Sequence, residues 1–178
     1  MQGAVIVTPR LYMRRMGNED IAPLSAILQD KDVMYAYEHA FSDGEVKQWL
    51  DRQMKRYEEY DFGLWAVILK ETECMIGQCG ITMQEVPEEL VSGGMVPEIG
   101  YLFRKDCRHK GYAAEAASAC REYAFNVPGF NEIYSIIRDN NIPSQNVAKR
   151  NGMTPAGTFV KHYYGMDMPH ILYKAERK

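Results

Sequence analysis

The sequence has no long apolar run, and this absence removes several classes of protein. Its longest uninterrupted apolar stretch, residues 64–69, is far shorter than the ~18 residues of a membrane span. The first residues also lack the apolar region of a secretory signal. We therefore expect a cytoplasmic protein that does not bind a membrane.

Cysteine is scarce and histidine is scattered, which argues against disulfides and metal sites. No cysteine forms a C-x-x-C pair or has a histidine at zinc-ligand spacing, and no two histidines stand four positions apart. We expect unpaired thiols, a reducing compartment and no metal ion. The residues concerned are Cys74, Cys79, Cys107, Cys120, His39, His109, His162 and His170.

Net charge is also small, −3, but it is unevenly distributed. Residues 1–89 carry 9 Lys and Arg against 16 Asp and Glu, whereas residues 90–178 carry 12 against 8. The positive half contains no long cationic run, which favours a compact anionic ligand over a nucleic-acid backbone. We expect no nucleic-acid partner.

The apolar pattern predicts one domain that mixes helices and strands, without repeats or linkers. The clearest helix start is the capping box Ser42-x-x-Glu45, which precedes apolar residues at helical spacing. Other helices are expected from Asn18, over residues 112–127 and from Pro143 to Gly152. Strands are expected at residues 11–14, 62–69, 75–83, 98–104, 132–138, 158–164 and 171–175, with a loop over residues 85–97.

The segment from Arg108 to Ala113 lies between an expected strand and an expected helix. The free N–H groups in the first turn of such a helix favour an anion. Gly111 and the small Ala113 allow a diphosphate to approach the backbone. Positive charge surrounds the turn at Arg104, Lys105, Arg108 and Lys110. Neither G-x-G-x-x-G nor a P-loop ending is present, so those phosphate sites are excluded.

Three motifs in order carry a resemblance to a known family. They are Glu98-Ile99-Gly100-Tyr101, then Arg108-x-x-Gly111-Tyr112-Ala113-x-Glu115-Ala116, then Asn141-x-x-Ser144 with Gly152-Met153. The set resembles the GCN5-related N-acetyltransferases (GNAT), and within them the branch that acetylates the N-termini of ribosomal proteins at alanine or serine. The resemblance covers nearly the whole chain, from Thr8-x-Arg10-Leu11 through the final strands.

The resemblance implies a single α/β (α+β) domain over residues 1–178. Its mixed, mostly antiparallel sheet would have about seven strands, splayed at the fourth and fifth, with about four flanking helices. It also implies acetyl-CoA as the acyl donor. The strand at residues 98–104 would pair with the pantetheine arm through its backbone, the amides of residues 108–114 would hold the diphosphate, and Asn141 would bond the pantetheine or serve only as a turn residue. The implied coenzyme A contacts are Leu102, Phe103, Arg104, Arg108, His109, Lys110, Gly111, Tyr112, Ala113, Ala114, Asn141, Ser144 and Arg150.

Acetyl transfer to an amine needs a base, a polarised carbonyl and a way to protonate the thiolate. Glu98 is the candidate base, or else a structurally paired side chain. A backbone N–H of Leu102 or Phe103 would polarise the carbonyl. Many relatives place a tyrosine acid where this chain has Ala148, so Ser144 is the substitute, unless it is only a helix cap. Tyr163 and Tyr164 are further candidates, or packing residues.

The acceptor is the least defined part of the prediction. Residues 34–39 and the 85–97 loop would line its site, where Glu38, Glu88 and Glu89 either attract a cationic amine or are simply solvated. The leading hypothesis is direct attack by a primary amine, from a protein N-terminus or a small molecule, without a covalent intermediate at Cys107. The alternative is a CoA-binding or sensing module without catalysis. Longer acyl groups, and a monomer or a homodimer, remain open.

Overall fold

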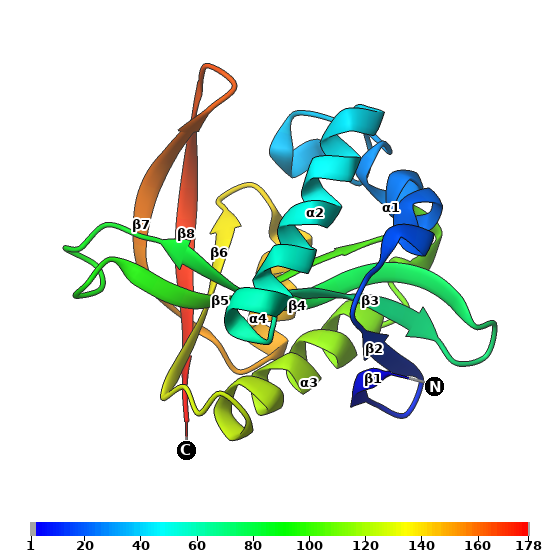
Figure 1. The fold of residues 1–178 in the computed structure, drawn as a ribbon. Coiled ribbons are helices and arrows are strands. Elements are labelled where there is room, and N and C mark those ends of the chain that lie inside the picture. Colours follow the sequence, from blue (N-terminus) through cyan, green and yellow to red (C-terminus); the bar gives the residue numbers. More distant parts are fainter. Residues whose placement is uncertain (1–2, 178) are drawn as a thin grey trace.

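The computed structural model describes residues 3–177, which form one eight-stranded sheet in the order β1-β2-β3-β4-β5-β6-β8-β7 (Figure 1). All neighbouring strands are antiparallel except β5 and β6, which are parallel. The strands are β1 (Ala4–Val7), β2 (Leu11–Arg14), β3 (Leu64–Leu69), β4 (Cys74–Glu85), β5 (Met95–Phe103), β6 (Glu132–Arg138), β7 (Thr154–Tyr163) and β8 (Met166–Glu176).

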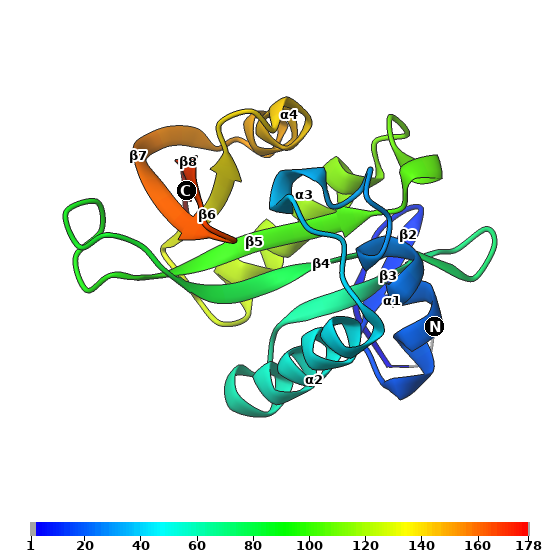
Figure 2. The same cartoon turned by 90° about the horizontal axis from the view of Figure 1, so that it is seen from above.

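Four α-helices cover the sheet, two on each face (Figures 1 and 2). Apolar residues of α1 and of most of α2 pack against one face. Those of α3 and α4, joined by Tyr57 of α2, pack against the other. No helix within residues 3–177 is long and apolar enough to cross a membrane. The helices are α1 (Ile21–Leu28), α2 (Asp43–Tyr60), α3 (Tyr112–Asn126) and α4 (Ile142–Arg150), with short 3₁₀ turns η1 (Asn18–Asp20), η2 (Tyr35–Tyr37) and η3 (Lys105–Cys107).

The mixed sheet and the helix count confirm the predicted fold, but the sheet has eight strands rather than about seven. The short first segment forms β1, so the splay falls between the fifth and sixth strands. The expected loop over residues 85–97 is also too long, because β4 continues to Glu85 and β5 begins at Met95. Likewise, β7 begins at residue 154 and β8 at residue 166, earlier than expected, and Tyr164 lies in the turn between them.

Pro97 suggested a loop, yet it lies within β5. Backbone groups of alternate residues point to opposite edges of a strand. Arg104 N donates to Ile76 O at 2.9 Å and Val86 N donates to Gly94 O at 2.9 Å, so the even-numbered residues of β5 bond to β4. Pro97 therefore faces away from β4, and its missing N–H costs no hydrogen bond in that ladder.

The start of α2 is the capping box that the sequence predicts. Ser42 Oγ accepts from Glu45 N at 3.4 Å, and Ser42 N donates to Glu45 Oε2 at 2.8 Å. His39 Nε2 also lies 2.8 Å from Glu45 Oε1. The N–H and the hydroxyl group of Ser42, which both donate to Glu45 Oε2 at 2.8 Å, and then His39 lower the pKa of Glu45 to about 2. Each of them stabilises the carboxylate at the positive end of the helix dipole.

We expect Ser42→Ala to lower the free energy of unfolding by about 1 kcal/mol, because loss of the Ser42 hydroxyl leaves the Glu45 N–H in the first turn without its partner. For a chain of this size, that loss corresponds to a fall in melting temperature of roughly 2–4 °C. Gly44→Ala is the control in the same helical turn. Its added Cβ meets no atom within 4 Å, so we expect the melting temperature to rise. An unchanged melting temperature in Ser42→Ala would contradict the role of the cap.

Candidate active site

The strands β5 and β6 meet at one point and then diverge. Their ladder contains a single pair, Glu98 with Tyr134. Side chains complete the junction, since Glu98 Oε1 accepts from Ile136 N at 3.1 Å and Ser135 Oγ donates to Ile99 O at 3.0 Å. Beyond this junction, no strand within residues 3–177 lies beside the backbone of β5 on the β6 side.

The alternation along β5 determines which backbone groups face this gap. Even-numbered residues bond to β4, so the N–H and C=O groups of Tyr101 and Phe103 point into the space between β5 and β6. The backbones of Leu102 and Arg104 point to β4 instead, and Arg104 N is bonded there. Of Leu102 and Phe103, the expected pantetheine contacts on β5, Phe103 is the one whose backbone faces the gap. The Tyr101 backbone, which was not among the expected contacts, faces it as well.

Glu98 lies at the apex of the gap with its side chain half-buried. Burial raises the pKa of its carboxyl group, against the lowering effects of Lys161, the Ile136 N–H, Thr82 and Arg56. Thr82 Oγ1 lies 3.4 Å from Glu98 Oε2. A carboxylate whose pKa is raised in this way is a stronger base than one in water.

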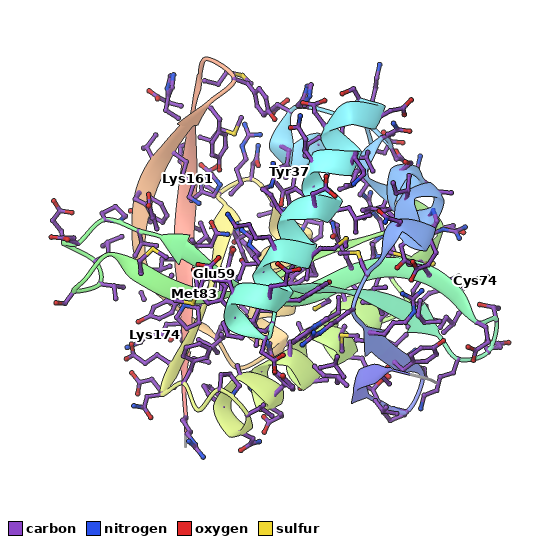
Figure 3. The ribbon with its side chains drawn as sticks, in the orientation of Figure 1. Tyr37, Glu59, Cys74, Met83, Lys161 and Lys174 are labelled. Carbon is purple, nitrogen blue, oxygen red and sulfur yellow. The ribbon has the colours of Figure 1, made fainter. Side chains whose placement is uncertain are left out.

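Side chains from α2, η2 and β7 lie close enough to Glu98 for their charges to act on one another. Two of them, Tyr37 and Lys161, are labelled in Figure 3. Tyr37 of η2 keeps 38% of its surface exposed, but its hydroxyl group is buried, which raises its pKa. The hydroxyl oxygen of Tyr163, on β7, lies 3.4 Å from His170 Nε2. Burial also raises the pKa of Tyr163. Tyr164 is exposed and packs on the His39 ring, with centroids 4.8 Å apart.

Arg138 ends β6 beside this space. Its Nη1 donates to Glu38 Oε1 at 2.6 Å and to Ala36 O at 3.3 Å. The Arg138 Nε is buried without a hydrogen-bond partner among residues 3–177. Glu38, which the sequence suggested as an attraction for a cationic amine, thus has its charge neutralised by Arg138.

The turn that the sequence predicted to bind phosphate lies between β5 and α3. Gly111 is the N-terminal cap of α3, with φ of +80°, and His109 has φ of +61°. No side chain caps this helix start, whose first intrahelical bond runs from Glu115 N to Gly111 O at 3.1 Å. The N–H groups of Tyr112, Ala113 and Ala114 therefore remain available to an anion.

The side chain of Arg10, which lies between β1 and β2, holds this turn in shape. Arg10 Nη1 donates to Lys110 O at 2.9 Å, and its guanidinium lies 4.6 Å from the Tyr112 ring centroid. Arg10 Nε donates to Glu115 Oε2 at 2.6 Å, and Thr8 Oγ1 donates to Glu115 Oε1 at 2.6 Å. Burial alone would raise the pKa of Glu115, but the hydrogen bonds from Thr8 and Arg10 outweigh it and lower the pKa. Thr8 and Arg10 belong to the opening motif of the family resemblance, but the sequence gave no sign that they contact Glu115.

The cations around the turn are mostly engaged with neighbouring groups. Arg104 Nη2 pairs with Asp106 Oδ2 at 2.7 Å, Lys105 pairs with Asp32, and Arg108 Nη2 donates to Asp32 O at 2.6 Å. The side chains of His109 and Lys110 are exposed. Positively charged side chains thus surround the turn, and Arg104, Lys105 and Arg108 among them are already held by hydrogen bonds or ion pairs.

Asn141 and Ser144 stand at the start of α4. Asn141 Oδ1 accepts from Ser144 N at 3.2 Å and from the Tyr35 hydroxyl at 2.7 Å. The cap role considered for Ser144 therefore belongs to Asn141, whose Nδ2 makes no hydrogen bond within residues 3–177. Tyr101 Oη donates to Ser144 O at 3.0 Å, which ties α4 to the gap-lining strand.

The remaining predicted positions are spread more widely. Ala148 is 2% exposed and packs in the core with α3 residues, and Arg150 is exposed at the end of α4. Cys107 is buried, and burial raises the pKa of its thiol, which makes it a poor nucleophile. Within residues 3–177, all four cysteines are free.

Comparison with known proteins places this geometry in a family. The Acetyltransferase (GNAT) domain matches residues 10–154. The chain is 34% identical to the uncharacterized protein YkkB of Bacillus subtilis over 157 residues, covering 88% of each chain. It is 31% identical to the uncharacterized N-acetyltransferase YnaD of the same organism, covering 88% of this chain and 86% of YnaD.

Solved structures agree. A GNAT-family acetyltransferase from Bacillus anthracis superposes with a TM-score of 0.78 at 25% identity, covering 96% of this chain and 97% of that one. The ribosomal L7/L12 α-N-protein acetyltransferase RimL, in complex with coenzyme A, has a TM-score of 0.79 at 15% identity, covering 97% of each chain, and so shares the fold. The matched domain, the N-acetyltransferase relative and the diverging strands together show that this chain belongs to the GNAT family of acetyltransferases.

Proposed function

We propose that the chain transfers an acetyl group from acetyl-CoA to a primary amine by direct attack. The observation that carries the proposal is the gap between β5 and β6, which has Glu98 at its apex and the open start of α3 at its mouth. A thioester arm lying in this gap brings its reactive end to the carboxylate. The coenzyme A bound to the fold-related RimL structure supports the same donor.

The donor is held by backbone groups in this proposal. The N–H groups of residues 112–114 bind the diphosphate, with His109 and Lys110 at its border. The backbones of Tyr101 and Phe103 pair with the pantetheine amides, and Asn141 Nδ2 donates to the same arm. Such an arm completes the edge of β5 as an added strand would.

The chemistry needs three proton and charge events. The amine nitrogen forms a bond to the thioester carbon, and Glu98 takes the amine proton directly or through one water. The gap-facing N–H of Tyr101 or Phe103 stabilises the carbonyl oxygen as it becomes negative. The C–S bond then breaks, and the coenzyme A thiolate takes up a proton to leave as the thiol.

Two hydroxyl groups are candidates for that proton. Ser144 lies in the first turn of α4, beside the gap-lining Tyr101, and Tyr163 lies on the Glu98 side of the sheet. The raised pKa of Tyr163 keeps it protonated at neutral pH, as an acid requires. The buried Ala148 supplies no such group, which is the one feature that favours a CoA-binding module without catalysis. Release of free thiol with an amine present distinguishes the two functions.

Gly111→Val should weaken acetyl-CoA binding at least tenfold. A Cβ at Gly111 would lie 3.4 Å from Arg10 Nη2, and the φ of +80° disfavours a β-branched residue. The added side chain would also stand where the diphosphate meets the helix start. Titration calorimetry with acetyl-CoA measures the dissociation constant.

The matched control is Gly129→Val, because Gly129 has φ of +76° and a Cβ there meets no atom within 4 Å. It imposes similar backbone strain away from the turn. We expect both variants to lose comparable thermal stability and only Gly111→Val to lose binding. Wild-type affinity in Gly111→Val would show that the turn does not hold the donor.

Glu98→Gln should lower kcat by about a hundredfold or more while leaving the dissociation constant of acetyl-CoA within about twofold. The glutamine oxygen can still accept from Ile136 N, so the junction of the strands is kept. In the wild type, the base works only when deprotonated, so kcat/KM falls as the pH drops through the pKa of Glu98, which burial holds above its ordinary value.

The contribution of Glu98 to that acidic limb should be absent from the pH profile of Glu98→Gln, while the contribution from protonation of the acceptor amine stays. The rates come from the free thiol released in samples quenched at fixed times, measured across a range of pH. The acceptors are polyamines, amino acids, aminoglycosides and a ribosomal-protein N-terminal peptide. A variant that retains both the wild-type rate and an unchanged acidic limb would assign Glu98 a structural role only.

A further inference from the structure

A strap of chain between α1 and α2, residues 32–38, connects the two sides of the gap between β5 and β6. On the β5 side, Arg108 Nη2 donates to Asp32 O at 2.6 Å. On the β6 side, Arg138 Nη1 donates to Ala36 O at 3.3 Å. In Figure 2 this strap is the blue segment that follows α1 and lies between β5 and α4. The strap is therefore held at both sides of the gap.

Tyr35 of this strap contacts the start of α4. Its hydroxyl group donates to Asn141 Oδ1 at 2.7 Å and makes no other hydrogen bond within residues 3–177. The Tyr35 side chain is 40% exposed and belongs to none of the apolar clusters of the described residues. Packing therefore explains little of its role, and the contact with Asn141 is its main interaction.

Two donors fix the orientation of the Asn141 side-chain amide. Besides Tyr35, Ser144 N donates to Asn141 Oδ1, at 3.2 Å. A backbone N–H only donates, so the atom of Asn141 that faces it must be the amide oxygen. The Asn141 Nδ2 group is the other end of this half-buried amide, and it makes no hydrogen bond within residues 3–177. Its N–H groups are therefore left for a ligand.

The Asn141 amide lies at the edge of the gap. Asn141 caps α4 and stands three residues after the end of β6. On the other side of the gap, Tyr101 Oη donates to Ser144 O in the first turn of α4 at 3.0 Å. Tyr101 is also a residue of β5 whose backbone groups face the gap. A ligand between β5 and α4 thus has the Tyr101 backbone on one side and the Asn141 amide on the other.

We propose that Tyr35 is a positioning residue for the acyl donor, because its hydroxyl group holds the Asn141 amide with Nδ2 directed to the pantetheine arm. This inference deepens the proposed function and rests on the contact proposed there between Asn141 and the arm. The strap contributes as well. Because it is held at Asp32 and Ala36, the Tyr35 hydroxyl is in place before the donor binds, so little conformational entropy is lost on binding.

Tyr35→Phe removes only the hydroxyl group and tests the proposal. We expect the dissociation constant of coenzyme A, measured by titration calorimetry, to rise about threefold to tenfold. The KM for acetyl-CoA should rise by a similar factor, with kcat within about twofold of the wild type. The probe 3′-phosphoadenosine 5′-diphosphate is coenzyme A without its pantetheine arm. Its dissociation constant should stay within about twofold, because the lost contact concerns the arm alone.

The matched control is Tyr12→Phe. The Tyr12 hydroxyl also donates to a side-chain oxygen at 2.7 Å, that of Glu73 Oε2, but it does so between β2 and the turn before β4. This variant therefore loses a hydrogen bond of the same kind away from the gap. We expect it to bind coenzyme A as the wild type does. An equal loss of affinity in Tyr12→Phe would overturn the proposal.

A double-mutant cycle tests whether Tyr35 acts through Asn141. Asn141→Ser keeps a hydroxyl group that can cap α4 but has no amide. We expect it to weaken coenzyme A binding about threefold to tenfold. Adding Tyr35→Phe to Asn141→Ser should then change the dissociation constant by less than about twofold, because the group that Tyr35 positions is gone. Additive losses would overturn the positioning role.

The outcomes distinguish this inference from the proposed function. Unchanged coenzyme A affinity in Tyr35→Phe, or an equal loss of affinity for 3′-phosphoadenosine 5′-diphosphate, would overturn the positioning role while acetyl transfer stands. If the wild type releases no thiol with any amine but Tyr35→Phe selectively weakens coenzyme A binding, the proposed transfer fails and the positioning role is supported. Failure of the wild type to bind coenzyme A would overturn both.

Discussion

The parting of β5 from β6 is the constraint on which the rest of the site depends. If the ladder continued beyond Glu98, the backbone groups of Tyr101 and Phe103 would be used inside the sheet. The Glu98 carboxylate and the Ser135 hydroxyl instead bond to Ile136 N and Ile99 O. Buried backbone groups need hydrogen-bond partners, and these two side chains supply them. The sheet can therefore open at the apex of the gap without unsatisfied backbone groups there. The residue that ends the pairing is also the carboxylate nearest the proposed chemistry.

Much of the fold follows from local pattern. The strand at residues 132–138 and the capping box at Ser42 appear in the structure where the sequence places them, because alternation and capping depend only on near neighbours. Strand ends were less predictable. Pro97 and the glycines before it read as a loop, and only the register with β4 shows that a proline is tolerated at that position.

The site was predictable in part, and the division has a physical reason. The uncapped helix start at Gly111 depends on consecutive residues, so the sequence could predict it. The gap-facing backbone of Tyr101 depends on which edge of β5 bonds to β4, a property of pairing rather than of composition. The role of Glu38 could not be judged from its neighbours in the sequence, because its partner Arg138 lies 100 positions away.

The contact between Arg10 and the start of α3 has a consequence for how the protein matures. Its partners, Glu115 and Lys110, lie 105 and 100 residues further along the chain. Contacts of such high sequence separation form only after much of the chain has collapsed, because the intervening loop must be closed first. The turn between β5 and α3 therefore takes its final shape only when the first strand pair has docked against α3. The proposed donor site is in this sense a property of the completed fold rather than of the local sequence around Gly111.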